Sequence, residues 1–489
     1  MGVCERFPKG LSALLLCGAV CCVSGLAAAA TLEPAEQSKY QRLVEVACEG
    51  EALDQLWAAR ALRALKTPWA LNQLEHLAKS ADLDVRLEAL LTLTEQGREE
   101  YEAEAAQACR EAVERGGVGR IRLAWRLGAR EEIPYLTKVG LETTDESELL
   151  AAVWTLARLA GVDKAEAVLG ERVEDHSAAK AVLQCAKYAE PGRPIGWGDR
   201  EWLILTSLTS PPTVRKYCLK TVAEWQSTAS AVPTVGYGVF GELLFDGELE
   251  TRCSAALGLV CTNWSSAIDL LRKALQREET VAGKACAAAA ILSLADLQVE
   301  NEPTSLCFGI PGLSPRGVLA ILLAGEACVR LASYMQEPEH FLIAAASVLS
   351  PQEREWLEAA GLQVEEFVSR LERVVESREF AQRSREELEE LADTCATYGL
   401  DEGVLDMFAR LEHPQSHAGS VFVSDRGRVA GDFAWRQYEQ ETGQAPTLLQ
   451  MMVLTLERIP EKQREVYLPE GTTWEGIRPV VKWRHRTED

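Results

Sequence analysis

Short runs of small and branched apolar residues recur along the chain at helical spacing. The clearest examples lie at 57–65, 85–93, 122–127 and 151–159. In each run apolar residues recur three or four positions apart, which places them on one face of a helix. The first two runs are offset by 28 residues and the last two by 29. The pattern predicts amphipathic helices arranged as a repeated hairpin.

A hairpin of that length cannot bury its apolar face alone, so neighbouring copies must stack. Stacked hairpins form a curved surface whose usual work is to hold another molecule. The pattern of apolar positions therefore predicts an all-α architecture and favours a binding function. It does not indicate what is bound.

Two segments carry a more specific signature. Asp84-Val85-Arg86, followed by Ala89-Leu90, resembles HEAT repeats and the shorter phycobilisome-lyase HEAT-like repeats. A second match runs from Glu250 to Leu259, with Glu and Thr in place of the Asp and Val of the pattern. The resemblance covers roughly residues 50 to 350. It implies a right-handed α-solenoid of helix hairpins, in which Asp84 begins a second helix and is placed to cap it.

Tetratricopeptide repeats are the main rival architecture. They require a regular 34-residue period and a framework of Trp, Gly and Tyr, and the chain shows neither. Stretches rich in Gly and Pro are expected to interrupt the array as long loops, because such stretches cannot continue a helix. They lie at 191–200, 232–247 and 301–317.

Changes in composition divide the chain into four expected parts. Residues 1–30 are expected to be a signal peptide, 31–350 the HEAT-like array, and 351–412 an acidic helical continuation of that array. Residues 413–489 are nearly balanced in charge and richer in β-branched residues. There we expect a small mixed α/β appendage, with a hairpin over 421–430, helices over 432–442 and 448–459, and a strand over 477–483.

The first thirty residues have the pattern of an export signal. Arg6 and Lys9 precede an apolar run, and Ala28-Ala29-Ala30 offers a small-residue cleavage site. We expect a periplasmic or secreted protein with no membrane span after cleavage near Ala30. The alternative is an N-terminal anchor, because the apolar run is nearly the roughly 20 residues that span a bilayer.

The formal net charge of −23 argues against a nucleic-acid partner, because phosphate binding needs clustered Lys and Arg. It is compatible with protein partners that present basic segments. Ten of the fourteen cysteines lie beyond the signal. Cys218, Cys253, Cys286 and Cys328 recur at similar places in successive helices, so we interpret them as buried small residues rather than a disulfide framework.

Searches for catalytic chemistry find no convergent set of residues. The one close histidine pair, His413 and His417, is separated by Pro414 and lacks an intervening carboxylate, so a surface loop is favoured over a metal site. The nearest serine motif, at 312–317, lacks the spacing of a nucleophile elbow. No enzyme activity, metal or cofactor is therefore expected.

The twelve tryptophans outnumber either tyrosine or phenylalanine. Trp125 and Trp154 fall at matching points of adjacent repeats, and Trp197 lies in the first Gly/Pro-rich stretch. On a concave face these residues would anchor a ligand, whereas between layers they would be core residues. The sequence thus predicts an exported scaffold that binds protein in the cell envelope. An enzyme-accessory or lyase-like role toward a cofactor or modified protein is the alternative that the resemblance permits.

Overall fold

The structure is a computed structural model that describes residues 32–190, 196–228, 233–262, 264–297, 313–397, 411 and 423–482. The elements that these residues form are helices, and an isolated bridge joins Gln336 to Val423. The expected all-α class is therefore confirmed. No helix in the described part of the chain is long and apolar enough to cross a membrane. The proposed signal and its cleavage site lie outside the described residues.

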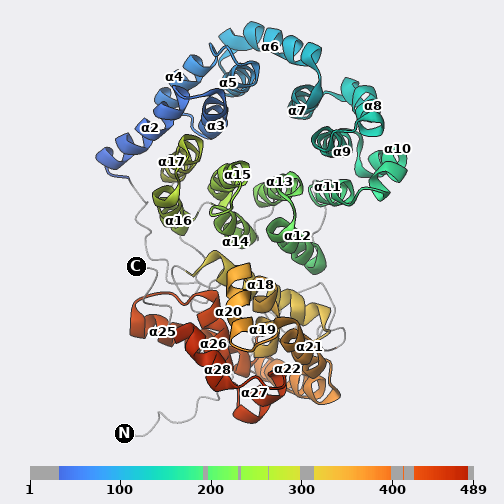
Figure 1. Cartoon of the computed structure of the whole chain (residues 1–489), viewed down its shortest axis with the longest axis vertical. Coiled ribbons are helices and arrows are strands. Elements are labelled where there is room, and N and C mark those ends of the chain that lie inside the picture. The colour runs from blue at the N-terminus through green and yellow to red at the C-terminus, as the bar shows by residue number, and fades with distance from the viewer. Residues whose placement is uncertain are drawn as a thin grey trace. The chain divides into compact units, whose positions relative to one another are not determined.

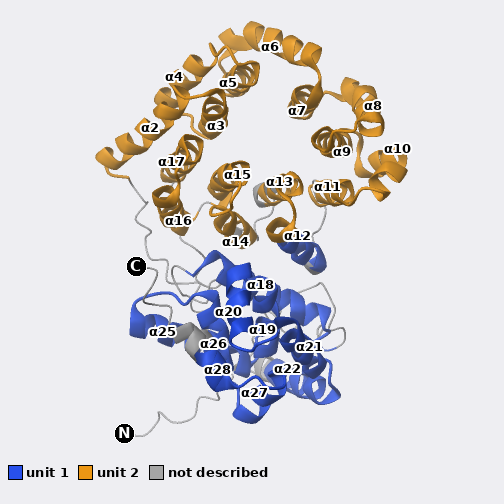
Figure 2. Ribbon diagram, viewed as in Figure 1, with its two compact units in different colours: residues 1–27, 196–205, 302–489 blue, residues 28–195, 206–301 orange. Residues whose placement is uncertain are grey.

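The chain divides into two compact units (Figure 2). Unit 2 comprises residues 28–195 and 206–301, and unit 1 comprises residues 1–27, 196–205 and 302–489. The division falls inside helix α12 (Trp197–Thr209) and again near residue 301, within the segment expected to form one array to residue 350.

Unit 2 consists of two concentric layers of helices (Figure 1). The inner layer is α3 (Ala52–Leu62), α5 (Leu83–Glu95), α7 (Gly117–Leu127), α9 (Glu146–Ala160), α11 (Ser177–Tyr188), α13 (Pro212–Thr228), α15 (Leu249–Leu259) and α17 (Val281–Asp296). The outer layer is α2 (Pro34–Cys48), α4 (Pro68–Leu77), α6 (Glu102–Arg115), α8 (Ile133–Glu142), α10 (Val162–Glu174), α14 (Pro233–Leu243) and α16 (Ser265–Arg277). Short 3-10 turns are η2 (Glu99–Tyr101), η3 (Arg130–Glu132) and η4 (Val260–Thr262). The four apolar runs that open the sequence pattern fall on α3, α5, α7 and α9, so they mark successive inner helices.

The inner layer closes on itself, because α17 packs against α2 and α3 at the other end of the unit. The α17 helix is rich in alanine and is buried along most of its length, which allows close approach of its neighbours. The carboxylate of Asp54 on α3 accepts a hydrogen bond of 3.1 Å from the Ala282 amide at the start of α17. In the outer layer Arg272 on α16 donates two hydrogen bonds, of 3.0 and 3.2 Å, to the Glu36 carboxylate on α2.

The helix starts follow ordinary capping chemistry, with one correction. Asp82, rather than the expected Asp84, is the N-cap of α5, and its carboxylate accepts hydrogen bonds from the amides of Asp84 and Val85. Asp84 lies within the first turn, where its negative charge suits the positive end of the helix. A positive φ at Gly116, Gly128 and Gly161 ends α6, α7 and α9 respectively.

Two of the expected Gly/Pro-rich loops are partly helical. The 232–247 stretch contains α14, which begins at Pro233. Proline is tolerated there because an amide hydrogen in the first turn of a helix has no acceptor within the helix. The helix is retained because its apolar face is buried, with Phe240 fully covered. Phe240 fits only because Gly258 on α15 has no side chain, since a Cβ there would lie 2.5 Å from the ring. The 191–200 stretch likewise ends in the first turn of α12. In the third stretch, residues 301–312 lie outside the described residues.

Unit 1 is a second helical assembly. Its helices are α18 (Pro315–Arg330), α19 (Pro338–Ser347), α20 (Pro351–Ala359), α21 (Val364–Val375), α22 (Arg378–Thr397), α24 (Asp425–Arg428), the π-helix η5 (Val429–Phe433), α25 (Ala434–Thr442), α26 (Leu448–Arg458), α27 (Glu461–Tyr467) and α28 (Trp474–Lys482). The acidic helices predicted in the tail are confirmed as α21 and α22, and the helices expected at 432–442 and 448–459 as α25 and α26.

The mixed α/β appendage is wrong for the described residues. Arg428–Ala430, expected to be a strand, lies in α24 and η5, and the strand expected at 477–483 is mostly α28. Ile477 of α28 is buried in the core. A helix can bury such a residue as well as a strand can. Short apolar runs do not distinguish the two states, and packing on a helical neighbour decides here.

The repeated cysteines lie in the core. Cys218, Cys253, Cys286 and Cys328 are all completely buried, and no disulfide joins any of them to another described residue. The Sγ atom of Cys185 on α11 lies 3.5 Å from that of Cys218 on α13, a contact between thiols rather than a bond. Cysteine therefore acts in the inner layer as a small apolar residue.

We expect alkylation of the native protein to label Cys261, which is exposed, and to spare the buried Cys185, Cys218, Cys253 and Cys286 until the protein is unfolded. A reagent must reach a thiol to modify it, and burial also disfavours the reactive thiolate. Mass spectrometry of peptides labelled before and after unfolding measures the pattern. Labelling of the buried thiols at the rate of Cys261 would contradict the core interpretation. So would an increase in mass on reduction, because the two added hydrogens would reveal a disulfide among them.

Candidate binding site on the inner face of unit 2

Two of the three tryptophans singled out in the sequence lie on neighbouring inner helices. Trp125 on α7 is half-buried, whereas Trp154 on α9 is only 1% exposed. Trp154 also packs against Tyr217 of α13, with ring centroids 5.4 Å apart. Trp154 is thus largely a core residue and Trp125 retains an accessible face. Trp197 is the first residue of α12, and its side chain lies outside what the structure describes.

Lys220 on α13 joins the aromatic residues into one group. Its Nζ atom lies 5.0 Å from the ring centre of Trp125, 5.9 Å from that of Trp154 and 5.2 Å from that of Tyr217. An ammonium group over aromatic faces at this distance is attracted by the ring quadrupole. Lys220 is partly accessible to solvent. The sequence places Trp125 and Lys220 far apart, and the fold brings them together on the inner face of unit 2.

Three more cations face Lys220 from around the ring. Arg60 and Arg122 come from α3 and α7, and Lys216 lies one turn before Lys220 on α13. We call Arg60, Arg122, Lys216 and Lys220 the inner cation cluster. Arg60 lies over the ring of Trp57 at 4.7 Å. No member of the cluster forms an ion pair with a carboxylate of the described residues. Arg122 is exposed and the other three are half-buried, so solvent reaches the cluster.

The electrostatic effect of this crowding is visible in the cluster itself. Burial, followed by the positive charges of Arg122, Lys216 and Arg60, lowers the pKa of Lys220 to about 8, although Glu250 opposes the shift. Burial is also the main cause that lowers the pKa of Lys216 and of Arg60. The inner face therefore carries positive charge that the fold does not neutralise.

Two of the four carboxylates near the cluster are committed to other cations. Glu88 pairs with Arg126 at 2.6 Å, and Glu224 pairs with Arg158 at 2.7 Å. The other two, Glu146 on α9 and Glu250 on α15, are exposed and act electrostatically on members of the cluster without forming an ion pair with them. Cations therefore exceed available carboxylates on this face, although acidic residues exceed basic ones in the chain as a whole.

The sequence pattern indicates Trp125 and Trp154 as candidate binding residues, but it does not indicate the inner cation cluster. Its members are separated by as many as 160 positions, and each is a single basic residue on an amphipathic helix, a position where exposed charge is ordinary. One signal was present: Lys216 and Lys220 are four residues apart on one helix face, a like-charge pair that costs stability unless it has a use.

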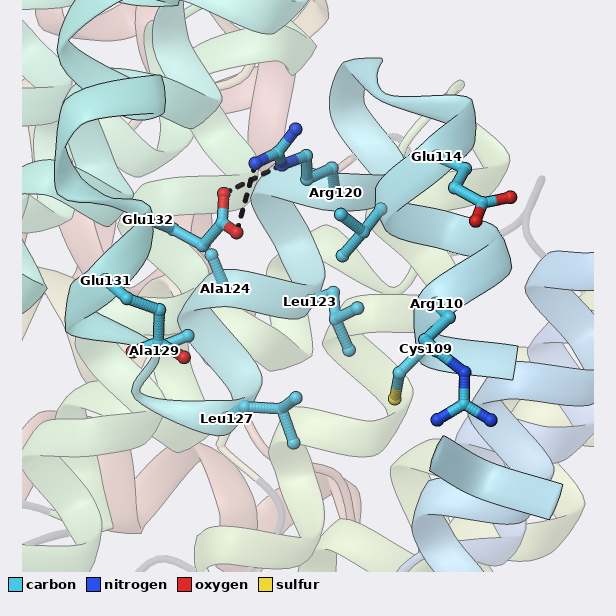
Figure 3. Close-up of a pocket in the computed structure, with 11 residues that line it drawn as sticks. Cys109, Arg110, Glu114, Arg120, Leu123, Ala124, Leu127, Ala129, Glu131 and Glu132 are labelled. Carbon is cyan, nitrogen blue, oxygen red and sulfur yellow. Dashed lines mark hydrogen bonds and ion pairs between the residues drawn. The ribbon is translucent and has the colours of Figure 1, made fainter. Parts of the chain in front are cut away.

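A separate cleft of about 270 Å³ lies between α6 and α7 (Figure 3). Leu123 and Leu127 line it, and Leu127 is 53% exposed. At its rim the guanidinium of Arg120 donates hydrogen bonds of 2.7 and 3.1 Å to the carboxylate of Glu132. This ion pair neutralises two of the charges at the cleft, whose lining also includes Arg110, Glu114 and the thiol of Cys109.

Unit 1 contains a buried ionic network of a different character. Glu337 and Glu339 of the segment before and within α19 are almost completely buried, and Arg426 bridges them with ion pairs of 3.1 Å each. Ser424 donates to Glu337 at 3.0 Å, and the Tyr467 hydroxyl donates to Glu339 at 2.5 Å. The network connects residues 423–467 to α19.

The two buried carboxyl groups differ in pKa. Burial and the charge of Glu339 raise the pKa of Glu337 to about 7. Burial alone would also raise the pKa of Glu339, but Arg426 and the Tyr467 hydrogen bond lower it by more.

The described residues were expected to hold no metal ion. No group of three or more His, Cys, Asp or Glu with the arrangement of a metal site occurs among them. His413 and His417 lie outside the described residues, so the expectation of a surface loop there stays a prediction. No protein family, curated protein or solved structure matches the chain.

Replacing Arg426 by Met should lower the free energy of unfolding by about 3–5 kcal/mol, because it leaves two buried carboxylates without their shared cation. Urea unfolding at neutral pH measures the loss. Arg385→Met is the matched control, because Arg385 pairs with Glu389 on an exposed helix face and should change stability by less than about 0.5 kcal/mol. Equal effects of the two substitutions would contradict a structural role for the network.

Replacing Lys220 by Met should make the protein more stable at pH 7, because the substitution removes a charge that the native state disfavours. The gain should be complete below about pH 8 and should shrink as the pH rises toward 10.5, the ordinary lysine value. In that window native Lys220 has lost its proton while the unfolded chain still holds one, so the wild type gains stability with pH. Unfolding midpoints across pH 7 to 10.5 measure this.

The control for that experiment is Lys138→Met, since Lys138 lies on the outer helix α8 with its side chain 70% exposed. It should show no comparable dependence on pH. A Lys220→Met variant that is less stable than the wild type at every pH would contradict the crowding of charge on the inner face.

Proposed function

We propose that this chain is an exported, HEAT-like binding scaffold of the cell envelope, and that the inner face of unit 2 holds a segment of a protein partner. The observation that carries the proposal is the meeting of Trp125 and Lys220 from two inner helices on one solvent-reached surface, next to the buried ring of Trp154. Aromatic residues backed by a rigid core are the usual anchors of protein interfaces.

The two tryptophans differ in exposure in a way that suits this role. Trp154 is buried against Tyr217 and lies 5.9 Å from the Lys220 ammonium, whereas the accessible Trp125 remains available for contact. A surface that is already ordered before binding loses little conformational entropy when a ligand arrives. The closed inner layer supplies that order, because each inner helix is held by neighbours on both sides or by paired charges.

Other parts of the proposal rest on the sequence. The HEAT-like assignment rests on the Asp84–Leu90 segment and its partner at Glu250–Leu259, and the envelope location on the apolar leader that ends at Ala30. The enzyme-accessory alternative rests on the same resemblance without a site of its own. Binding is favoured because the surface offers an accessible aromatic anchor at Trp125 and the unpaired charge of the inner cation cluster.

The proposal is tested by site-specific photocrosslinking in the source cell. A photoreactive phenylalanine analogue placed at position 125 should capture one defined protein, because an aromatic group there preserves the anchor. The same analogue at position 138, on the exposed face of α8, should not capture that protein. Mass spectrometry of the crosslinked band identifies the partner.

The Trp125→Ala variant supplies the complementary measurement. It should lose the partner in competition with the wild-type chain while retaining helix content and unfolding midpoint within a few degrees. By contrast Trp154→Ala should lower stability by about 3–5 kcal/mol, as expected for a buried aromatic residue. Capture of the same proteins from positions 125 and 138, or unfolding of Trp125→Ala, would refute the proposed surface.

A further inference from the structure

The inner cation cluster distinguishes between kinds of partner. Arg60, Arg122, Lys216 and Lys220 project from α3, α7 and α13 without ion-pair partners, while the chain as a whole is strongly acidic. Like charges held together repel one another, and their accumulation without pairing costs stability. Such an arrangement is retained where a bound group of opposite charge neutralises it.

We propose that the inner face of unit 2 binds an acidic peptide segment, whose carboxylates pair with Arg60, Arg122, Lys216 and Lys220 while its side chains contact Trp125. This assignment rests on the proposed binding function and names the chemistry of its ligand. It reverses the charge expected from composition, since an acidic chain was expected to select basic segments.

The distribution of the cations fits several anionic groups rather than one. They come from three helices around the closed layer, and the pKa of Lys220 responds to all three of the others together with Glu250. Arginine presents a planar fork that pairs with both oxygens of a carboxylate, and lysine adds a compact charge beside it. Glu250 lies at the edge of the same group and would exclude ligands that place negative charge next to α15.

A long polyanion such as a nucleic acid is disfavoured by the rest of unit 2. Acidic side chains outnumber basic ones over this unit, so a strand that extends beyond the inner face would meet repulsion. A short carboxylate-bearing segment confines its charge to the cluster. The surroundings therefore favour a peptide.

The test uses the full chain and a short oligoglutamate peptide, with binding followed by calorimetry and tryptophan fluorescence. The wild type should bind the peptide, with affinity that falls as salt rises. The Arg122→Gln, Lys220→Met double variant should bind at least about tenfold more weakly, which corresponds to the loss of one or two charge-assisted contacts. The matched double variant Arg42→Gln, Lys138→Met removes the same charges from the exposed faces of α2 and α8 and should bind within about twofold of the wild type.

Two further probes separate the sources of negative charge. Inorganic phosphate and a short single-stranded oligonucleotide should bind more weakly than oligoglutamate at equal ionic strength. Binding of either one more tightly, with the same sensitivity to the inner-face variant, would overturn the peptide assignment in favour of that ligand. No binding of oligoglutamate, or equal loss in the two double variants, would also overturn it.

Crosslinking separates this inference from the proposed function. If the inner-face variant with the photoreactive group at position 125 still captures the partner, binding stands and its acidic character is refuted. If no partner is captured from the wild type although oligoglutamate binds, the anionic site stands and the protein-scaffold function is refuted.

Discussion

The closure of α17 onto α2 and α3 is the contact on which the rest of unit 2 depends. It brings together residues more than 220 positions apart, and its hydrogen bonds join the ends of both layers: Asp54 to Ala282 inside and Arg272 to Glu36 outside. An open stack of hairpins would leave the ends of the inner layer exposed and would require polar capping repeats. Here each end helix covers the other, so the apolar faces of the first and last hairpins are buried without dedicated caps.

Closure also determines what the inner face can be. Arg60 and Arg122 belong to the first half of the unit, and Lys216 and Lys220 to the second, so their electrostatic coupling exists only because the two halves face one another. The fold thereby concentrates positive charge in the interior of an acidic protein. A cluster of this kind opposes folding, and it persists because burial of the surrounding inner helices outweighs the repulsion.

Much of the helical layer could be predicted from the sequence, because amphipathic spacing reports directly which face is buried. The runs around Trp57, Val85, Trp125 and Trp154 each became an inner helix, and the buried cysteines followed from their position in that pattern. Elements whose state depends on partners distant in sequence were predicted less well. The segments at 428–430 and 477–483 have strand-like composition but pack as helices, and α14 forms despite its glycines because Gly258 admits Phe240.

The candidate site shows the same limit. Trp125 and Trp154 were identifiable as a pair because they occupy similar places in two apolar runs, yet Trp154 is covered by Tyr217 from another inner helix. The inner cation cluster was not identifiable, because helical periodicity gives the direction of each side chain but not the curvature of the stack. Only curvature decides whether basic residues on separate hairpins point apart or converge.

A closed arrangement also sets an order of events during synthesis. Helices α2 and α3 emerge from the ribosome first, but their final neighbour α17 is translated last among the inner helices. An open repeat array can begin folding at any hairpin and extend from there, whereas this unit must keep its first hairpin available until the last has been made. The apolar faces of α2 and α3 stay uncovered during that interval, so the ring is completed only after its last inner helix has been made.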